Sequence, residues 1–290
     1  MNYPMFRTLC LAALVAGLPS GPLAAQLAPP KLAIPYGENA AAGATAAING
    51  IRLHYETYGA GQPLLVIHGN GGSIRDMGYQ IQFFTPNYRI IAADSRGHGQ
   101  SGMGPGRLTY EQQAEDLNAL LDKLEVKSAC VLGWSDGGIL GLLLAIHHPD
   151  KVAKLAIMGA NLNPNGAYNW ALQWVDRENK TVDAMIAKGD KTQPWPVLKQ
   201  YLNLLGTQPQ IPVADLAKIK APTLVMAADR DVIRLEHTQL IFDHLARAHL
   251  AIFPGATHMI PWTDHELFNQ TVARFFSREF VRPDTAEIFK

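Results

Sequence analysis

Residues 133–138 read Gly-Trp-Ser-Asp-Gly-Gly, and this stretch restricts the fold of the chain more than any other. The apolar residues 129–132 before it are typical of a short buried strand, and the apolar residues 139–146 after it are typical of a buried helix. A Gly-x-Ser-x-Gly pattern between a strand and a helix is the context of a nucleophile elbow, where a sharp turn projects the serine hydroxyl above the edge of a sheet. Ser135 is therefore the candidate nucleophile. The alternative is a glycine-rich turn whose serine only caps the helix.

Strand and helix patterns alternate along most of the chain. Asn49-Gly50 lies between two short strand patterns and predicts a hairpin. Continuous apolar runs, typical of strands covered on both faces, follow at residues 63–67, 88–93, 152–158, 222–228 and 250–253. Residues 109–124 carry apolar side chains at helical spacing. This alternation predicts an α/β protein with a mostly parallel sheet and helices on both faces.

The alternation breaks between residues 161 and 215, where tryptophans and other apolar residues fall on short helical stretches separated by Gly and Pro. We interpret residues 161–215 as a helical cap inserted between two parts of one core, residues 45–160 and 216–290. The alternative is plain helical packing. Trp170 in this insertion and Trp134 beside the serine are candidate substrate-binding residues.

A serine hydroxyl is a weak nucleophile at neutral pH and needs a general base. Of the 10 histidines, His258 comes shortly after the last expected strand, so in a parallel sheet it emerges at the same edge as Ser135. A carboxylate must orient the imidazole and stabilise its cation. Asp229 and Asp231 both follow the preceding strand. We favour Asp231, because the longer loop brings it toward His258, and we expect Asp229 to bind local backbone.

The tetrahedral oxyanion of acyl transfer needs two N–H donors. We expect them to be the backbone N–H groups of Asp136, next to the nucleophile, and of Asn70, in a glycine-rich loop after an early strand. His68 in the same loop could act as a second base, but we favour a structural role in holding the loop.

Together these residues resemble the α/β-hydrolase fold family. The resemblance spans residues 46–278, and its ordered matches are residues 68–72 (His-Gly-Asn-Gly-Gly), residues 94–101 (Asp-Ser-Arg-Gly-His-Gly-Gln-Ser), the elbow, Asp231 and His258. It implies an eight-stranded twisted sheet, a helical cap, and the triad and oxyanion donors named above. Ser135 at the elbow argues against the relatives that dehalogenate or hydrolyse epoxides, since those use an aspartate there.

Within the family, residues 132–139 and 158–161 look like the biphenyl hydrolase-like, or valacyclovir hydrolase, branch. In that branch the acidic residue after the nucleophile binds the amino group of an aminoacyl ester. The resemblance therefore implies that Asp136 binds a substrate amine. The alternative is a carboxylate favoured only by the start of a helix.

The N-terminus is typical of an exported protein. Arg7 precedes the apolar residues 9–18, and residues 19–25 are helix-breaking and small. We predict a signal peptide over residues 1–25, a flexible linker or surface segment over residues 26–44, and a periplasmic or secreted protein. The apolar run is too short for a confident membrane span, so no stable membrane insertion is expected after cleavage.

Composition excludes several other classes of function. The 25 basic and 25 acidic residues leave no net formal charge, and no basic stripe suggests nucleic acid. No spacing of histidines builds a zinc site, so we expect neither a metal nor an organic cofactor. The expected activity is hydrolysis of a small carboxylic ester through an acyl-enzyme. A peptidase, an amidase or a carbon–carbon bond hydrolase on the same triad, or a low-turnover ligand receptor, are the alternatives.

Overall fold

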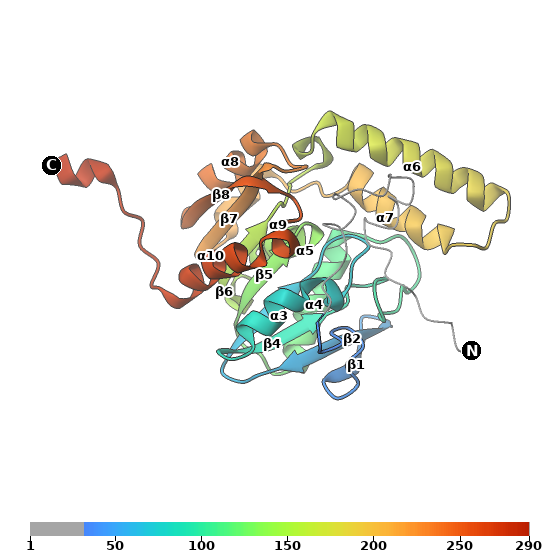
Figure 1. Ribbon diagram of the computed structural model, residues 1–290, viewed down its shortest axis with the longest axis horizontal. Helices are drawn as coiled ribbons and strands as arrows, with labels where there is room; N and C mark the ends of the chain where they lie inside the picture. The colour runs from blue at the N-terminus through green and yellow to red at the C-terminus, as the bar shows by residue number, and fades with distance from the viewer. Residues whose placement is uncertain (1–31, 290) are drawn as a thin grey trace.

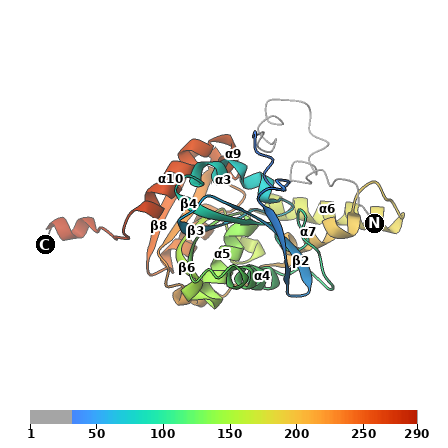
Figure 2. The ribbon, with the colours of Figure 1, turned by 90° about the horizontal axis from the view of Figure 1, so that it is seen from below.

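The computed structural model describes residues 32–289, which form an eight-stranded sheet with helices on both faces (Figures 1 and 2). The strands are β1 (Gly43–Ile48), β2 (Ile51–Tyr58), β3 (Gln62–Ile67), β4 (Tyr88–Ala93), β5 (Ala129–Trp134), β6 (Val152–Met158), β7 (Thr223–Arg230) and β8 (Ala248–Thr257). Their spatial order is β1-β2-β4-β3-β5-β6-β7-β8. Only the β1–β2 and β2–β4 pairs among them are antiparallel. The predicted mostly parallel, eight-stranded sheet is confirmed.

Helices pack on the two faces in separate groups, with α4, α5 and α8 on one face and α3, α9 and α10 on the other (Figure 2). The helices are α3 (Gly78–Phe84), α4 (Tyr110–Lys123), α5 (Asp136–His147), α6 (Asn169–Ala187), α7 (Trp195–Thr207), α8 (Leu235–Asp243), α9 (Ile260–Thr263) and α10 (His265–Ser277). Short 3-10 helices span Ile74–Met77, Pro149–Lys151, Pro164–Gly166, Val213–Lys218 and Thr285–Phe289.

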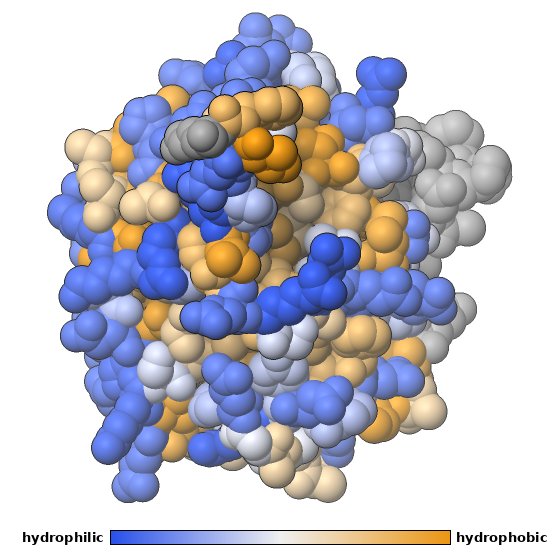
Figure 3. All heavy atoms as spheres, turned by 90° about the vertical axis from the view of Figure 1, so that its left-hand side faces the viewer, coloured by the Kyte–Doolittle hydropathy of each residue, from blue (hydrophilic) through white to orange (hydrophobic). Residues whose placement is uncertain are grey.

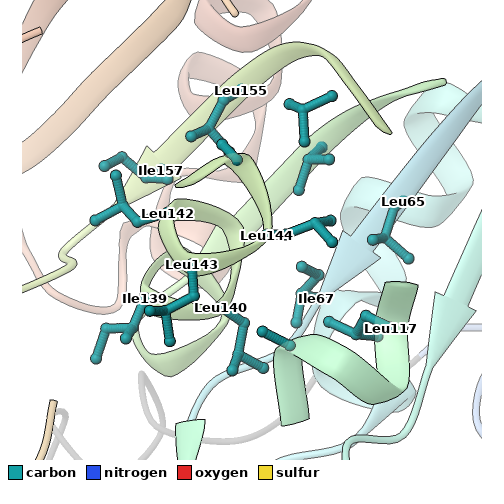
Figure 4. Packing of buried hydrophobic residues seen from close by; sticks show 14 of the residues in the cluster. Leu65, Ile67, Leu117, Ile139, Leu140, Leu142, Leu143, Leu144, Leu155 and Ile157 are labelled. Atoms are coloured by element: carbon teal, nitrogen blue, oxygen red, sulfur yellow. The ribbon is translucent and has the colours of Figure 1, made fainter. Parts of the chain in front are cut away.

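Both faces of the central strands are buried, which explains their continuous apolar sequences. Along β3, Leu65 and Ile67 belong to the core on the α5 side, whereas Leu64 and Val66 belong to the core on the α3 side. Figure 4 shows the leucines of α5 packed among side chains of β3, β6 and α4. Each fully buried Leu or Ile contributes roughly 1.5–3 kcal/mol, so this packing fixes α5 and the turn before it.

The predicted signal peptide lies outside the described residues, as does the first part of the predicted linker. From Leu32 onward the chain lies on the surface, but it is anchored rather than free. Tyr36 is buried, and the backbone N–H groups of Gly37 and Asn39 donate to the Glu56 carboxylate on β2, each at 2.9 Å. Anchoring by a buried carboxylate explains why this Ala- and Pro-rich segment is ordered before β1 begins.

Residues 161–215, called the cap segment below, contain the helix pair α6 and α7. The two helices project beyond the sheet (Figure 1) and share a small apolar cluster of Val175, Val182, Leu198 and Leu202. A backbone bond from Tyr168 N to Val232 O joins the segment to the loop after β7, and a bond from Ile211 N to Leu162 O joins the two ends of the segment to each other. The cap segment is therefore a separate packing unit tied to the strand ends.

The opposite side of the molecule carries the outer strand β8, α10 and the C-terminal tail. The tail extends away from the body (Figures 1 and 2), and its root is held where His249 Nε2 lies 2.7 Å from the Val281 carbonyl oxygen. Hydrophobic and hydrophilic residues are interspersed on this face (Figure 3), and Leu250 and Ile252 of β8 are exposed. Within residues 32–289, no helix combines the length and apolarity that a membrane crossing requires.

Candidate active site

Ser135 lies at the turn between β5 and α5 with φ of 58° and ψ of −121°. A non-glycine residue in this region is strained, at an order of 1–3 kcal/mol, and such strain gathers at functional sites. Glycines make the turn possible, because a Cβ atom on Gly133 would overlap the Gly137 carbonyl and one on Gly137 would overlap the Ile67 carbonyl. The backbone N–H of Ser135 donates to Met158 O at 2.7 Å, which fixes the turn to β6.

His258 and Asp231 form a buried pair at the same edge of the sheet. His258 follows β8 and Asp231 follows β7, and His258 Nδ1 lies 2.6 Å from Asp231 Oδ1. The backbone N–H groups of Ala228, Val232 and Ile233 also donate to the Asp231 carboxylate, at 2.7–3.2 Å. With four donors around it, this carboxylate is held in one orientation.

In this pair, each residue favours the charged form of the other. Burial lowers the pKa of His258, but the Asp231 charge and hydrogen bond outweigh it, so the net pKa is raised above the usual 6.5. Burial alone would raise the pKa of Asp231, but His258 and the backbone donors bring it below its ordinary value. Asp229, the other carboxylate considered, accepts from the backbone N–H of Gly255 at 2.9 Å.

Ser135 and His258 both line a cavity of about 300 Å³ between the sheet edge and the cap segment. The cap segment contributes mainly apolar groups to its wall, namely Pro164, Ala167, Trp170, Ala171, Leu172, Trp174, Val175 and Leu205. Val232, Met259 and Trp262 add apolar surface from the loops after the strands. Of the two predicted substrate-binding tryptophans, Trp134 is buried, whereas Trp170 is 57% exposed although it lines the cavity.

Asn70 and Asp136 also line this cavity. Asp136 is the first residue of α5, so its backbone N–H has no acceptor within the helix. His68 fills a structural position behind Asn70. Its Nε2 accepts from the Ser95 N–H at 3.0 Å, its Nδ1 lies 2.7 Å from Gly69 O, and burial lowers its pKa to about 4. A neutral imidazole with both nitrogens engaged holds the loop.

Asp136 is 5% exposed, and burial raises its pKa to about 6 although the Asn70 amide and the Tyr110 hydroxyl oppose that rise. The polar corner of the cavity thus consists of Asn70, Tyr110 and Asp136. Nothing between residues 32 and 289 groups three or more His, Cys, Asp or Glu side chains in a way that could hold a metal ion.

Comparison with known proteins agrees with this architecture. The family model described as the alpha/beta hydrolase fold matches residues 62–193. Serine hydrolase BPHL of Mus musculus is 25% identical over 270 residues, covering 84% of this chain and 92% of that protein. A crystal structure of a hydrolase from Pseudomonas aeruginosa PA01 is 26% identical with a TM-score of 0.69, covering 83% of this chain and all of that one. This chain has the alpha/beta hydrolase fold.

Other relatives of this chain carry different names. One is 3-oxoadipate enol-lactonase 2 of Acinetobacter baylyi, which is 26% identical over 258 residues, or 79% of this chain and 94% of that protein. The resemblance to the biphenyl hydrolase-like branch is confirmed as a similarity in sequence, and the enzyme class is hydrolase. The relatives do not share one substrate.

The sequence did not indicate the surroundings of two residues at this site, Trp134 and Tyr110. Trp134 Nε1 donates to the His258 carbonyl at 2.9 Å, and its ring packs on Trp262 at 5.2 Å between centroids. Trp134 therefore holds the His258 loop as well as lining the cavity. Tyr110, at the start of α4, lies in the cavity wall beside Asp136. The sequence around a tryptophan or tyrosine does not indicate which polar group its side chain will contact in the folded protein.

Proposed function

We propose that this alpha/beta hydrolase cleaves a small carboxylic ester through an acyl-enzyme on Ser135, with His258 as the general base and Asp231 as its partner. The observation that carries the proposal is the buried 2.6 Å pair of His258 and Asp231 beside a cavity that Ser135 also lines. Asp231 occupies Nδ1, which leaves Nε2 of His258 as the nitrogen able to exchange a proton with Ser135.

In the first half of the reaction, Ser135 Oγ forms a bond to the ester carbonyl carbon while its proton passes to His258 Nε2. The carbonyl oxygen becomes an oxyanion, for which we assign the backbone N–H groups of Asn70 and Asp136 as donors. The bond from the carbonyl carbon to the alcohol oxygen then breaks, and His258 returns the proton to the departing alcohol. Ser135 is left acylated.

In the second half, water attacks the acyl carbon and gives its proton to His258 Nε2. The bond to Ser135 Oγ breaks, the proton passes to Ser135, and the carboxylic acid leaves. Asp231 stabilises the imidazolium formed in each half, which fits the raised pKa of His258. No step requires a metal or an organic cofactor.

The cavity supports a small substrate with an apolar part. A volume of about 300 Å³ is at the lower end of the usual range for small-molecule sites. The aromatic and aliphatic wall formed by the cap segment suits an acyl or alcohol group of a few carbons. The polar corner of Asn70, Tyr110 and Asp136 offers hydrogen bonds inside a largely apolar space.

Covalent labelling tests the proposal. A fluorophosphonate probe should modify the folded protein once, at Ser135, and Ser135→Ala should abolish both labelling and hydrolysis of p-nitrophenyl butyrate. We expect the loss of turnover to be at least about 10³-fold, the order seen when a triad member is removed. Peptide mapping of the labelled protein identifies the modified residue.

Two outcomes would contradict the proposal: no labelling of folded wild-type protein, or unchanged ester hydrolysis by Ser135→Ala. Labelling without turnover of any ester in a panel of acyl lengths would favour the low-turnover receptor. Faster cleavage of matched amides than of esters would favour an amidase or peptidase on the same residues.

A further inference from the structure

The two residues assigned as oxyanion donors are joined to each other by their side chains. Asn70 Nδ2 donates to Asp136 Oδ2 at 2.8 Å, across 66 residues of sequence. Asn70 lies in the loop after β3, and Asp136 begins α5. In the proposed reaction, the backbone N–H groups of Asn70 and Asp136 both donate to the substrate oxyanion. The bond between their side chains therefore fixes the relative position of the two donors.

The same amide also reaches the cap segment. Asn70 Nδ2 lies 3.3 Å from the carbonyl oxygen of Tyr201 on α7. An amide nitrogen carries two hydrogens, so one can bond to Asp136 and the other to Tyr201. Tyr201 is itself fixed, because its ring stacks on His98 at 4.2 Å between centroids and its hydroxyl donates to Gly97 O. The loop of Asn70 is thus tied to both α5 and α7.

The Asp136 carboxylate is buried, and the group that hydrogen-bonds to it is the neutral amide of Asn70. Its neighbours are the Asn70 amide and the Tyr110 hydroxyl. A carboxylate that anchors a substrate ammonium needs an oxygen directed at that cation. Here one oxygen is directed at Asn70 instead, so the geometry favours an internal role over the amine-binding role that the resemblance implies.

Small displacements matter at such a site. An oxyanion donor acts when it lies about 2.7–3.1 Å from the developing negative charge, and loss of one donor typically lowers kcat by about 10²- to 10³-fold. Backbone donors cannot be removed by mutation, but their spacing can be disturbed through the side chains that fix it.

We propose that the hydrogen bond between Asn70 and Asp136 is a clasp that sets the spacing of the two oxyanion donors, so that Asp136 is a positioning residue and not an anchor for a substrate amine. This inference rests on the proposed function. The bond from Asn70 to Tyr201 extends the clasp to the cap segment.

The test uses Asn70→Ala, Asp136→Ala, the double variant and Asp136→Asn, each assayed on p-nitrophenyl butyrate and on the p-nitrophenyl ester of valine. Each alanine variant should lower kcat on both esters by about 10- to 100-fold, with KM changed less than about 3-fold, because a displaced donor acts in the transition state. The double variant should be no slower than the slower single variant, because both remove one interaction.

Asp136→Asn supplies the conservative rescue. Its side-chain oxygen can still accept from Asn70, so it should recover most of the activity that Asp136→Ala loses on both esters. The affinity of an aryl boronic acid, which forms a tetrahedral adduct with the serine, should fall in parallel with kcat/KM across the series. Circular dichroism and thermal unfolding identify any variant whose loss comes from misfolding.

Several results would overturn the clasp. Asp136→Asn and Asp136→Ala could lose activity equally on the valine ester while the butyrate ester is unaffected, which is the signature of an amine anchor. The effects of the two alanine changes could multiply in the double variant, or boronate affinity could stay constant. If wild-type protein is neither labelled at Ser135 nor active, the proposed function fails and the clasp falls with it. If the wild-type protein is labelled and active and the alanine variants are as active as wild type, only the clasp is disproved and the proposed function stands.

Discussion

The sheet edge and the cap segment hold their cavity-lining residues in different ways. At the sheet edge, Asp231 receives one side-chain and three backbone hydrogen bonds and is 5% exposed. In the cap segment, Trp170 lines the same cavity while 57% exposed, on a 19-residue helix whose buried residues are Val175 and Val182. The strand ends thus preorganise the proposed chemistry, and we propose that the cap supplies substrate-binding side chains that can change without disturbing the core.

The largest expected effect comes from the sheet edge. Asp231→Asn should lower kcat/KM on p-nitrophenyl butyrate by about 10³- to 10⁴-fold, because an amide neither stabilises the imidazolium nor holds the required tautomer of His258. Steady-state kinetics with active-site titration measures this loss. The matched control is Asp229→Asn, two residues earlier and near the end of β7, which should stay within about 5-fold of wild type because Asp229 contacts Gly255 and not His258.

Equal losses of kcat/KM in Asp229→Asn and Asp231→Asn would contradict a specific role for Asp231 and would show that either change disturbs the structure of the sheet edge. Thermal unfolding of both variants separates the two effects. Asp231 has a lowered pKa, so its contribution to stability is present above its unfolded pKa near 3.8 and is lost as pH falls through its folded pKa.

The cap segment should show a smaller effect of a different kind. Trp170→Ala should raise KM for p-nitrophenyl butyrate by about 3- to 10-fold and change kcat less than about 3-fold, since an apolar wall contact of this sort is worth about 1 kcal/mol in ground and transition states alike. The control is Ile186→Ala on the same helix, which is 40% exposed and does not line the cavity. A large fall in kcat for Trp170→Ala would contradict the division of roles.

The sheet and the edge positions were predictable because their signals are local or repeat along the chain. Apolar runs covered on both faces mark the strands, and the glycines around Ser135 mark a turn too tight for side chains. Parallel strands then bring the residues that follow β5, β7 and β8 to one edge. The greater distance of Asp231 from the end of the apolar run was enough to prefer it to Asp229 as the partner of His258.

The side-chain contacts around the site were not predictable in this way. The bonds from Asn70 to Asp136, from Asn70 to Tyr201 and from Trp134 to His258 span 66, 131 and 124 residues. Each depends on the direction of a side chain within the packed interior, which a one-dimensional pattern does not encode. From sequence alone, the acidic residue after the nucleophile fits an amine anchor and a helix-start carboxylate equally well.

The smallest expected effect tests whether the charge of Asp136 influences the protonation of His258. The Asp136 charge raises the pKa of His258, after the larger effects of burial, which lowers it, and of Asp231, which raises it. His258 must be neutral to act as a base, so kcat/KM falls as pH drops through its pKa.

Removing the charge in Asp136→Asn should lower the pKa of His258 and move the acid limb of the profile to lower pH. At pH 6 the variant should therefore keep a larger fraction of its maximal kcat/KM than wild type keeps of its own. The difference should be less than about 10-fold, and kcat/KM measured over a series of pH values checks it. An acid limb that stays in place would mean that the Asp136 charge is screened from His258, and Asp136 would then affect the reaction through the position of the oxyanion donors and not through its charge.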